Sequence, residues 1–100
     1  YGPWIVTSDD IPDPTRLTLT SRLNGLEMQR SGTDLLIYSV PLIVSYLSEI
    51  TTLVPGDVIA TGTPAGVGHR RDPQVWMKKG DRIEVEITDI GILANTVEDE

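Results

Sequence analysis

TGTPAGVG, the stretch at residues 61–68, follows the apolar run Val58-Ile59-Ala60 and leads into polar, basic sequence. Its three glycines and one proline disfavour a continued strand or helix, because glycine loosens the backbone and proline lacks a donor N–H. The change from apolar to glycine-rich sequence therefore predicts a buried strand over residues 57–61 that ends in a small-residue loop. The rest of the chain is interpreted around this strand and loop.

The glycine-rich loop is a candidate anion site. Thr61 and Thr63 place hydroxyls on either side of Gly62, and such a loop exposes backbone N–H groups that suit a carboxylate or a phosphate. No Lys follows its glycines, and their spacing differs from the dinucleotide fingerprint, so neither common nucleotide-binding motif fits. A strand-to-loop turn without any ligand is the alternative.

The composition is that of an acidic globular chain. A net charge of −7 over 100 residues argues against nucleic acid or an anionic membrane as a partner. There is no cysteine, which excludes disulfides and thiolate metal sites. No apolar run is long enough to span a bilayer and no signal peptide is evident, so we expect a cytoplasmic protein. We expect residues 1–100 to form a single domain, and a start without Met inside strand-like sequence suggests a piece of a longer protein.

Alternation of apolar and polar residues predicts most of the strands. Leu17, Leu19 and Leu23 share one face of residues 16–23, and Ile83, Val85 and Ile87 share one face of residues 82–87. The full set of expected strands covers residues 1–7, 16–23, 26–30, 57–61, 82–87 and 92–97. With a single helix, this predicts a mainly β domain of the α+β class.

The one predicted helix spans residues 40–50. Ser39 is suited to the N-cap position, and Pro41 falls in the first turn, where a missing N–H is tolerated. The helix carries an apolar stripe of Val40, Ile43, Val44, Leu47 and Ile50. Such a stripe normally packs on a core, so we expect it to cover a sheet.

Two acidic groups are candidate cation sites. Asp9, Asp10 and Asp13 lie close together in sequence, but they lack the calcium-binding loop pattern, and turn-forming aspartates are the favoured interpretation. Glu84 and Glu86 point to the same side of a strand and could chelate a cation, although ordinary inside-outside alternation produces the same pattern. Residues 98–100 are expected to form a solvated acidic end.

Two further polar residues have a functional and a structural interpretation. His69 is the only histidine and could act as a general base, but a lone His in a polar loop is more often solvated. Asn24 could contact a ligand. The pair Asn24-Gly25 is also the strongest short signal for a type I′ hairpin turn, and the turn is favoured.

A series of motifs, in order along nearly the whole chain, resembles the C-terminal part of the catalytic domain of the fumarylacetoacetate hydrolase family. The matching segments are GPWIVT at residues 2–7, DIPDP at 10–14, Asn24-Gly25, LVPGDVI at 53–59, TGTPAGVG at 61–68, KGD at 79–81 and EVEI at 84–87. The match in order is more specific than any single motif.

The resemblance implies a mixed β-sandwich roll and a divalent cation, most often Mg²⁺, with Mn²⁺ or Ca²⁺ as alternatives. It implies cleavage or rearrangement of C–C bonds in 2-oxo or 1,3-dicarbonyl acids, by hydrolysis, decarboxylation or isomerisation. It also implies a small-molecule substrate and a homodimer of the full-length protein. A non-catalytic β module or partner subunit that lacks the metal site is the alternative.

Few of the family's site residues transfer to this chain. The resemblance implies that Thr63, beside Gly62, contacts the carboxylate or oxo group of the substrate, with Thr61 and Gln29 as weaker candidates. The family's acidic metal ligands, and its His and Lys, correspond to positions before Tyr1. Glu84 and Glu86 match the family's final strand instead, so the resemblance places no metal ligand and no catalytic residue within residues 1–100.

Overall fold

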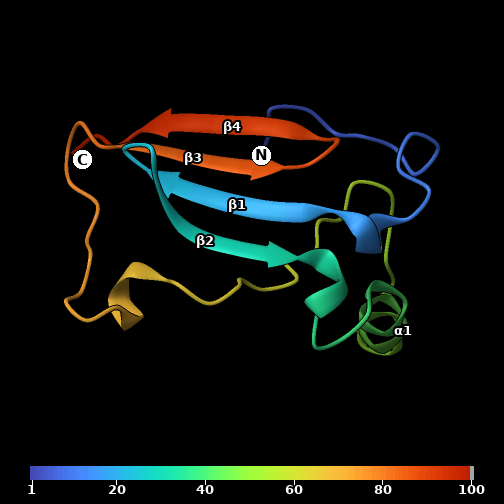
Figure 1. Cartoon of the computed structure of the whole chain (residues 1–100). Coiled ribbons are helices and arrows are strands. Elements are labelled where there is room, and N and C mark those ends of the chain that lie inside the picture. Colours follow the sequence, from blue (N-terminus) through green and yellow to red (C-terminus); the bar gives the residue numbers. More distant parts are fainter. Residues whose placement is uncertain (100) are drawn as a thin grey trace.

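An antiparallel sheet of four strands occupies the centre of the structure (Figure 1). This computed structural model describes residues 1–99, and Glu100, the last residue of the acidic end, lies outside them. The strands are β1 (Thr18–Leu23), β2 (Leu26–Gly32), β3 (Arg82–Ile87) and β4 (Gly91–Thr96), and the helix is α1 (Val40–Ile50). Short 3-10 helices lie at Pro14–Arg16, Thr33–Leu35 and Gly68–Arg70. The strand order is β2-β1-β3-β4, so β2 is an edge strand. The predicted mainly β class with one helix is confirmed.

The turn between β1 and β2 is the one that the sequence predicts. Asn24 has φ 51° and Gly25 has φ 81°, the two positive φ values that a type I′ turn requires. The Asn24 side chain also holds the start of β3. Its Oδ1 accepts from the backbone N–H of Arg82 at 2.9 Å, and its Nδ2 donates to Oδ1 of Asp81 at 2.8 Å. Asn24 is therefore a structural residue.

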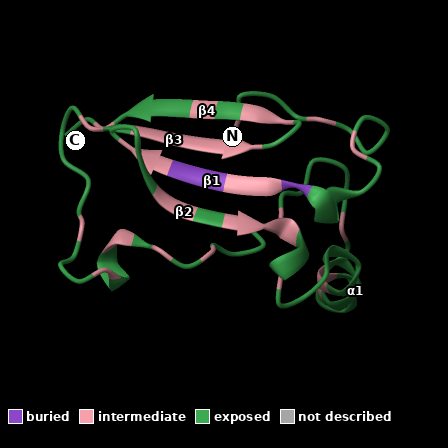
Figure 2. Ribbon diagram, viewed as in Figure 1, coloured by how far each residue is buried: buried purple, intermediate pink, exposed green. Residues whose placement is uncertain are grey.

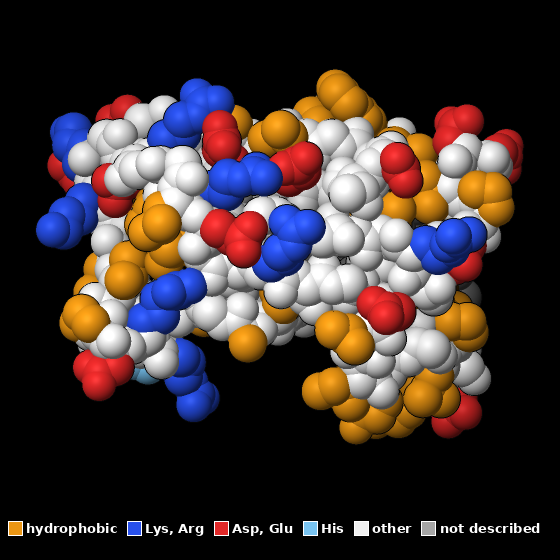
Figure 3. Space-filling model, viewed as in Figure 1, with side chains coloured by type: hydrophobic (Ala, Val, Ile, Leu, Met, Phe, Trp, Pro, Cys, Tyr) orange, Lys and Arg blue, Asp and Glu red, His pale blue; other side chains and the backbone are white. Residues whose placement is uncertain are grey.

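The sheet has one apolar and one charged face. Leu19 pairs with Ile87, and Leu23 pairs with Ile83, on the apolar face. On the opposite face, two arginine–glutamate pairs form: Nη2 of Arg22 lies 2.5 Å from Oε2 of Glu86, and Nε of Arg82 lies 2.9 Å from Oε1 of Glu84. Charges of both signs are intermixed over this part of the surface (Figure 3). Ordinary alternation therefore accounts for Glu84 and Glu86, and the cation-binding interpretation is not supported.

Burial is concentrated on β1 and the residue before it (Figure 2). The only buried hydrophobic residue among those described is Leu17, and the buried polar residues are Thr20 and Ser21. The accessible surface is 8001 Å², whereas a globular monomer of this size exposes about 5,600 Å². The radius of gyration of 15.5 Å also exceeds the value of about 13 Å that is usual for 100 residues. The described chain therefore buries less surface than a self-contained domain of its length.

Two predicted strands are absent from the described residues. Residues 57–61 form no ladder, and Val58 is 63% exposed, so the prediction of a buried central strand is wrong. Residues 1–7 also form no strand. Instead, Trp4 packs beside Gly91, and a Cβ added to Gly91 would lie 2.9 Å from the indole ring of Trp4. Apolar sequence alone does not make a strand, because the backbone also needs a neighbour with which to pair, and no described segment pairs with either stretch.

Helix α1 has the predicted bounds but not the predicted packing. Ser39 occupies the N-cap position, although its side chain makes no capping hydrogen bond. No residue of α1 is buried, and Val44 and Ile50 are 39% and 68% exposed. The helix lies beside the end of the sheet, and apolar side chains gather on the surface there (Figures 1 and 3). The expectation that its stripe covers the sheet is therefore wrong, since periodicity shows which face is apolar and not what covers it. No helix in the described part of the chain is long and apolar enough to cross a membrane.

Candidate functional site

The glycine-rich loop, defined here as residues 61–68, is irregular as predicted and lies against β2. Gly62 and Gly66 have φ values of 108° and 103°, which side-chain-bearing residues rarely adopt. A Cβ on Gly66 would collide with the backbone carbonyl oxygen of Met28. Glycine at this position therefore permits close contact between the loop and the edge strand.

Arg71 stabilises this contact between the loop and β2. Its Nε donates to the carbonyl oxygen of Gly66 at 3.0 Å, and its Nη2 donates to the carbonyl oxygen of Met28. Both acceptors are backbone atoms, one in the loop and one in β2. Because a guanidinium presents several donors in a fixed plane, it can hold the two segments in register.

Gln29 makes a second link between β2 and the loop. Its Nε2 donates to Oγ1 of Thr63 at 2.9 Å and to the carbonyl oxygen of Pro64 at 2.8 Å. Its Oε1 accepts from Oγ of Ser21 at 2.9 Å. Ser21 lies directly opposite Gln29 across the β1–β2 ladder and is buried. The three side chains therefore form a continuous hydrogen-bonded chain from the central strand to the loop.

A cavity of about 630 Å³ opens in front of the loop. The loop side of its wall is formed by residues 61–65, and the opposite side by the end of β2, Thr33, residues 35–38 and Ile43 of α1. Arg30 is the one charged residue among the described residues that line it, and its Nη1 lies 3.6 Å from Oε2 of Glu27. Hydroxyl donors and apolar walls suit a small organic anion.

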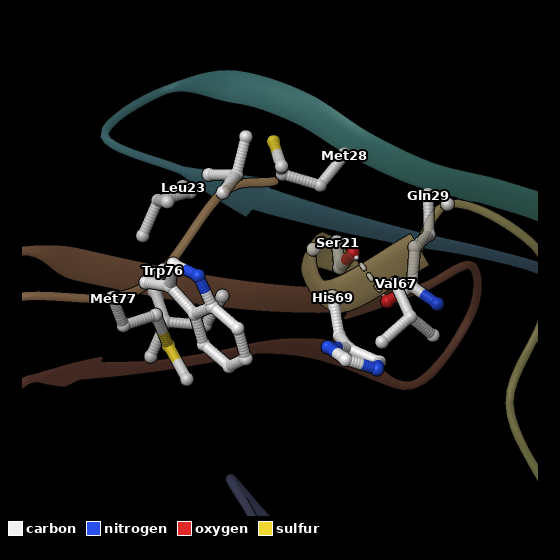
Figure 4. Close-up of a pocket in the computed structure, with 12 residues that line it drawn as sticks. Ser21, Leu23, Met28, Gln29, Val67, His69, Trp76 and Met77 are labelled. Atoms are coloured by element: carbon white, nitrogen blue, oxygen red, sulfur yellow. Dashed lines mark hydrogen bonds between the residues drawn. The ribbon is translucent and has the colours of Figure 1, made fainter. Parts of the chain in front are cut away.

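A smaller cavity of about 270 Å³ lies on the other side of Gln29, under the apolar face of the sheet (Figure 4). Its walls are mostly apolar and include Leu23, Met28 and Trp76. The ring of His69 lies 5.5 Å from the Trp76 ring, centroid to centroid, and its Nδ1 lies 3.3 Å from Nε2 of Gln74. His69 is exposed, and it does not line the cavity in front of Thr63. The interpretation of His69 as a surface residue is favoured over that of a general base.

The lining of the larger cavity does not suit a divalent cation. Cations such as Mg²⁺ and Ca²⁺ prefer carboxylate and carbonyl oxygens, whereas this lining has no carboxylate. Within residues 1–99, no three His, Asp or Glu side chains gather in a group that could hold a metal ion. The side chains that this chain contributes are those of an anion site.

The aspartates near the N-terminus include a capping residue. Asp13 Oδ1 accepts from the backbone N–H of Thr15 at 3.1 Å and from its hydroxyl at 2.6 Å. The hydrogen bonds from Thr15 lower the pKa of Asp13, because they stabilise the ionised carboxylate. The turn interpretation of this acidic segment is confirmed, and the calcium interpretation is not supported.

The structure brings the predicted site residues together. Thr61, Gly62 and Thr63 line the larger cavity, and Gln29 reaches that cavity through Thr63. Sequence reasoning did not identify Ser21 or Arg71. Ser21 had a detectable signal, because it is a polar residue between Leu19 and Leu23 on the predicted inward face. Arg71 had none, since a cation in a polar segment is expected to be solvated.

Comparisons with known proteins agree with this architecture. Residues 1–98 match the family model described as fumarylacetoacetate (FAA) hydrolase C-terminal. The chain is 43% identical over 96 residues to a Bos taurus protein named oxaloacetate tautomerase FAHD2A, mitochondrial. This match covers 96% of the present chain and 31% of the Bos taurus protein. It is 44% identical over 91 residues to 2,4-didehydro-3-deoxy-L-rhamnonate hydrolase of a Sphingomonas species, covering 90% and 32% of the two chains.

Solved structures of similar proteins share the fold. Fumarylacetoacetate hydrolase from Exiguobacterium antarcticum superposes with a TM-score of 0.95 at 45% identity, covering 100% of this chain and 36% of that one. Maleylpyruvate hydrolase from a Sphingobium species, in complex with manganese(II) and pyruvate, superposes with a TM-score of 0.85 at 38% identity, covering 95% and 33%.

These relatives are longer than the described chain. The chain spans about a third of the length of the curated relatives it matches, 31% and 32% in the two named above. The matches nevertheless extend over almost all of this sequence, and they confirm the resemblance that its motifs indicate. The chain belongs to the fumarylacetoacetate hydrolase family and corresponds to its C-terminal domain.

Proposed function

We propose that this chain is the C-terminal part of an enzyme that hydrolyses, decarboxylates or isomerises 2-oxo or 1,3-dicarbonyl acids. In this proposal, Thr63 donates a hydrogen bond to the carboxylate or oxo oxygen of the substrate, and Gly62 and Thr61 complete the wall around that oxygen. One observation carries the proposal: the Thr63 hydroxyl lines an open cavity and accepts, rather than donates, its hydrogen bond from Gln29. Its own hydrogen is therefore available to a ligand.

The chemistry of the cavity supports an oxo acid. Hydroxyl donors suit oxygens that gain negative charge during C–C cleavage or enolisation, because donors fixed in advance stabilise such charge. The Sphingobium relative is described with pyruvate bound, which carries both a carboxylate and an oxo group.

A divalent cation is part of the proposal, held by residues outside this chain. Two relatives are described with manganese, and we propose Mg²⁺ as the ion used in the cell. Such an ion, when bound, supplies polarisation of an oxo or enolate oxygen. The residues of this chain bind the acid, orient it and donate to its oxygens.

We further propose a homodimer of the full-length protein in the cytoplasm. The large uncovered surface, with exposed apolar residues on α1, supports extensive contacts with further protein. Several mammalian relatives are named as mitochondrial, so cell fractionation tests the compartment directly. Sedimentation of the full-length protein tests the dimer.

A Thr63→Val substitution in the full-length protein tests the enzymatic proposal. It removes the hydroxyl while it keeps the size of the side chain, and turnover of a 2-oxo acid such as oxaloacetate should fall about tenfold or more. Thr52→Val is the matched control, because Thr52 is exposed and lines neither cavity, and it should leave turnover unchanged. Equal turnover in both variants and the parent would remove Thr63 from the site.

A non-catalytic β module is the second candidate, favoured by the lack of a group of metal-ligating side chains within residues 1–99. Calorimetric titration of the full-length protein with Mn²⁺ separates the two functions. Binding of the ion followed by binding of an oxo acid supports the enzyme. Failure of the full-length protein to bind either one supports the module.

A further inference from the structure

We propose that Ser21 and Gln29 form a positioning relay that fixes the direction of the Thr63 hydroxyl, so that its hydrogen points into the cavity. This inference rests on the proposed function, in which Thr63 donates to the substrate. In it, Gln29 does not contact the substrate. Gln29 acts through Thr63, and Ser21 acts through Gln29.

The orientation of the Gln29 amide follows from Pro64. The carbonyl oxygen of Pro64 lies 2.8 Å from the amide, and a carbonyl oxygen can only accept. The NH₂ end of the amide must therefore face the loop. One N–H of this group is used by Pro64, and the other points to Oγ1 of Thr63 at 2.9 Å.

The opposite end of the amide is held by Ser21. With the NH₂ group facing the loop, Oε1 faces β1 and needs a donor, which the Ser21 hydroxyl supplies at 2.9 Å. Ser21 is only 5% exposed, so water competes little for this bond. A buried hydroxyl that would otherwise lack a partner gives the amide a strong preference for one orientation.

These contacts fix the donor-to-acceptor direction of every hydrogen bond in the relay. Ser21 donates to Gln29, and Gln29 donates to Thr63. Oγ1 of Thr63 therefore accepts a hydrogen bond from the protein. The Thr63 hydrogen is left for an acceptor on the side of the cavity. Hydrogen bonds in such a chain polarise one another, which makes the terminal hydroxyl a better donor.

A double-mutant cycle in the full-length protein tests the relay, with pyruvate and Mn²⁺ as the probe and calorimetry as the measurement. Gln29→Glu has nearly the same shape, but an ionised carboxylate only accepts, so Thr63 would donate to it and lose its hydrogen to the protein. We expect pyruvate affinity to fall about tenfold. In the Thr63→Val background, the same Gln29→Glu change still removes the bond to the Pro64 carbonyl, but it should cost several-fold less affinity, because no hydroxyl remains to be reoriented.

Comparison with the Thr63→Val background also distinguishes the relay from simple charge repulsion. A new negative charge that repels pyruvate would act with or without the Thr63 hydroxyl, so an equal loss in both backgrounds overturns the relay. Ser21→Ala is a second variant that adds no charge, and we expect a loss of about threefold that likewise disappears in the Thr63→Val background.

Neutron diffraction from deuterium-exchanged crystals of the full-length protein gives a readout that needs no ligand. The relay predicts a deuteron on Nε2 of Gln29 directed at Thr63, and a Thr63 deuteron directed into the cavity. A Thr63 deuteron directed at Gln29 overturns the relay. If the deuterons are placed as predicted and pyruvate does not bind, the relay stands and the proposed function fails.

Discussion

Arg71 and Gly66 are joined by a hydrogen bond of 3.0 Å from the guanidinium Nε to the backbone carbonyl oxygen, and the same guanidinium reaches the carbonyl oxygen of Met28. This pair of bonds connects the glycine-rich loop to the edge strand of the sheet. The position of Thr63 therefore depends on residues that do not line the larger cavity. Stability and site geometry should respond together when these contacts are changed.

Replacing Arg71 tests this dependence. Arg71→Met keeps much of the side-chain length but removes both donors, and we expect the free energy of unfolding to fall by about 2 kcal/mol, as is typical for hydrogen bonds from a charged group. Urea denaturation of the full-length protein gives the measurement. Arg70→Met is the matched control: it removes the same charge from an exposed neighbour whose side chain makes no described hydrogen bond, and it should change the free energy little.

Replacing Gly66 tests the close approach of the loop to β2. Gly66→Ala should cost about 3 kcal/mol or more, because its φ of 103° disfavours a side chain and its Cβ would strike the Met28 carbonyl. Gly80→Ala shares the positive φ, at 84°, but meets no atom within 4 Å, and it should cost about 1 kcal/mol. Equal costs for the two variants would show that the Met28 contact does not constrain the loop.

The fold illustrates what local sequence can predict. The Asn24-Gly25 turn, the bounds of α1 and the alternation of β3 are all decided by residues close in sequence, through φ preferences and side-chain spacing. The ladder partner of residues 57–61 and the covering of α1 are not decided locally, and both predictions were wrong. In each case, the sequence pattern described a property of one segment, whereas the outcome depended on a second segment.

The candidate site shows the same division. Thr61, Gly62 and Thr63 were identifiable, because glycine and hydroxyl residues after an apolar run indicate a ligand-facing loop. The link between Gln29 and Thr63 was not, since it joins positions 34 residues apart. Their contact depends on a loop folding back onto an edge strand, and no periodicity reports such a contact.

Asp81 gives the structure a predictable response to acid. Its carboxylate accepts from Nδ2 of Asn24 at 2.8 Å and from the backbone N–H of Lys78 at 2.7 Å. The Asn24 bond first, and the Lys78 bond second, lower the pKa of Asp81 by stabilising its ionised form. The pKa of Asp81 is therefore lower in the folded than in the unfolded protein, and this difference stabilises the fold. The stabilisation is fully present above the unfolded-state pKa, near pH 4, and is lost as pH falls through the folded-state pKa.

The Asp81→Asn variant checks this sign. Urea denaturation from about pH 6 down to about pH 2 should show that the variant loses less stability than the parent over the acid part of the range. An NMR titration of the parent should show the Asp81 carboxyl titrating below the usual aspartate range. A parallel loss in both proteins would mean that the Asn24–Asp81 contact does not form in solution.

The proposed enzyme depends above all on the Thr63 hydroxyl donating to a ligand in the cavity in front of the glycine-rich loop. A crystal structure of the full-length protein with Mn²⁺ and pyruvate tests it most directly. We expect a carboxylate or oxo oxygen of pyruvate within hydrogen-bond distance of Oγ1 of Thr63, with Gln29 still bonded to the same atom. Pyruvate bound elsewhere, or a Thr63 hydroxyl that donates to a protein carbonyl beside a closed cavity, would contradict it.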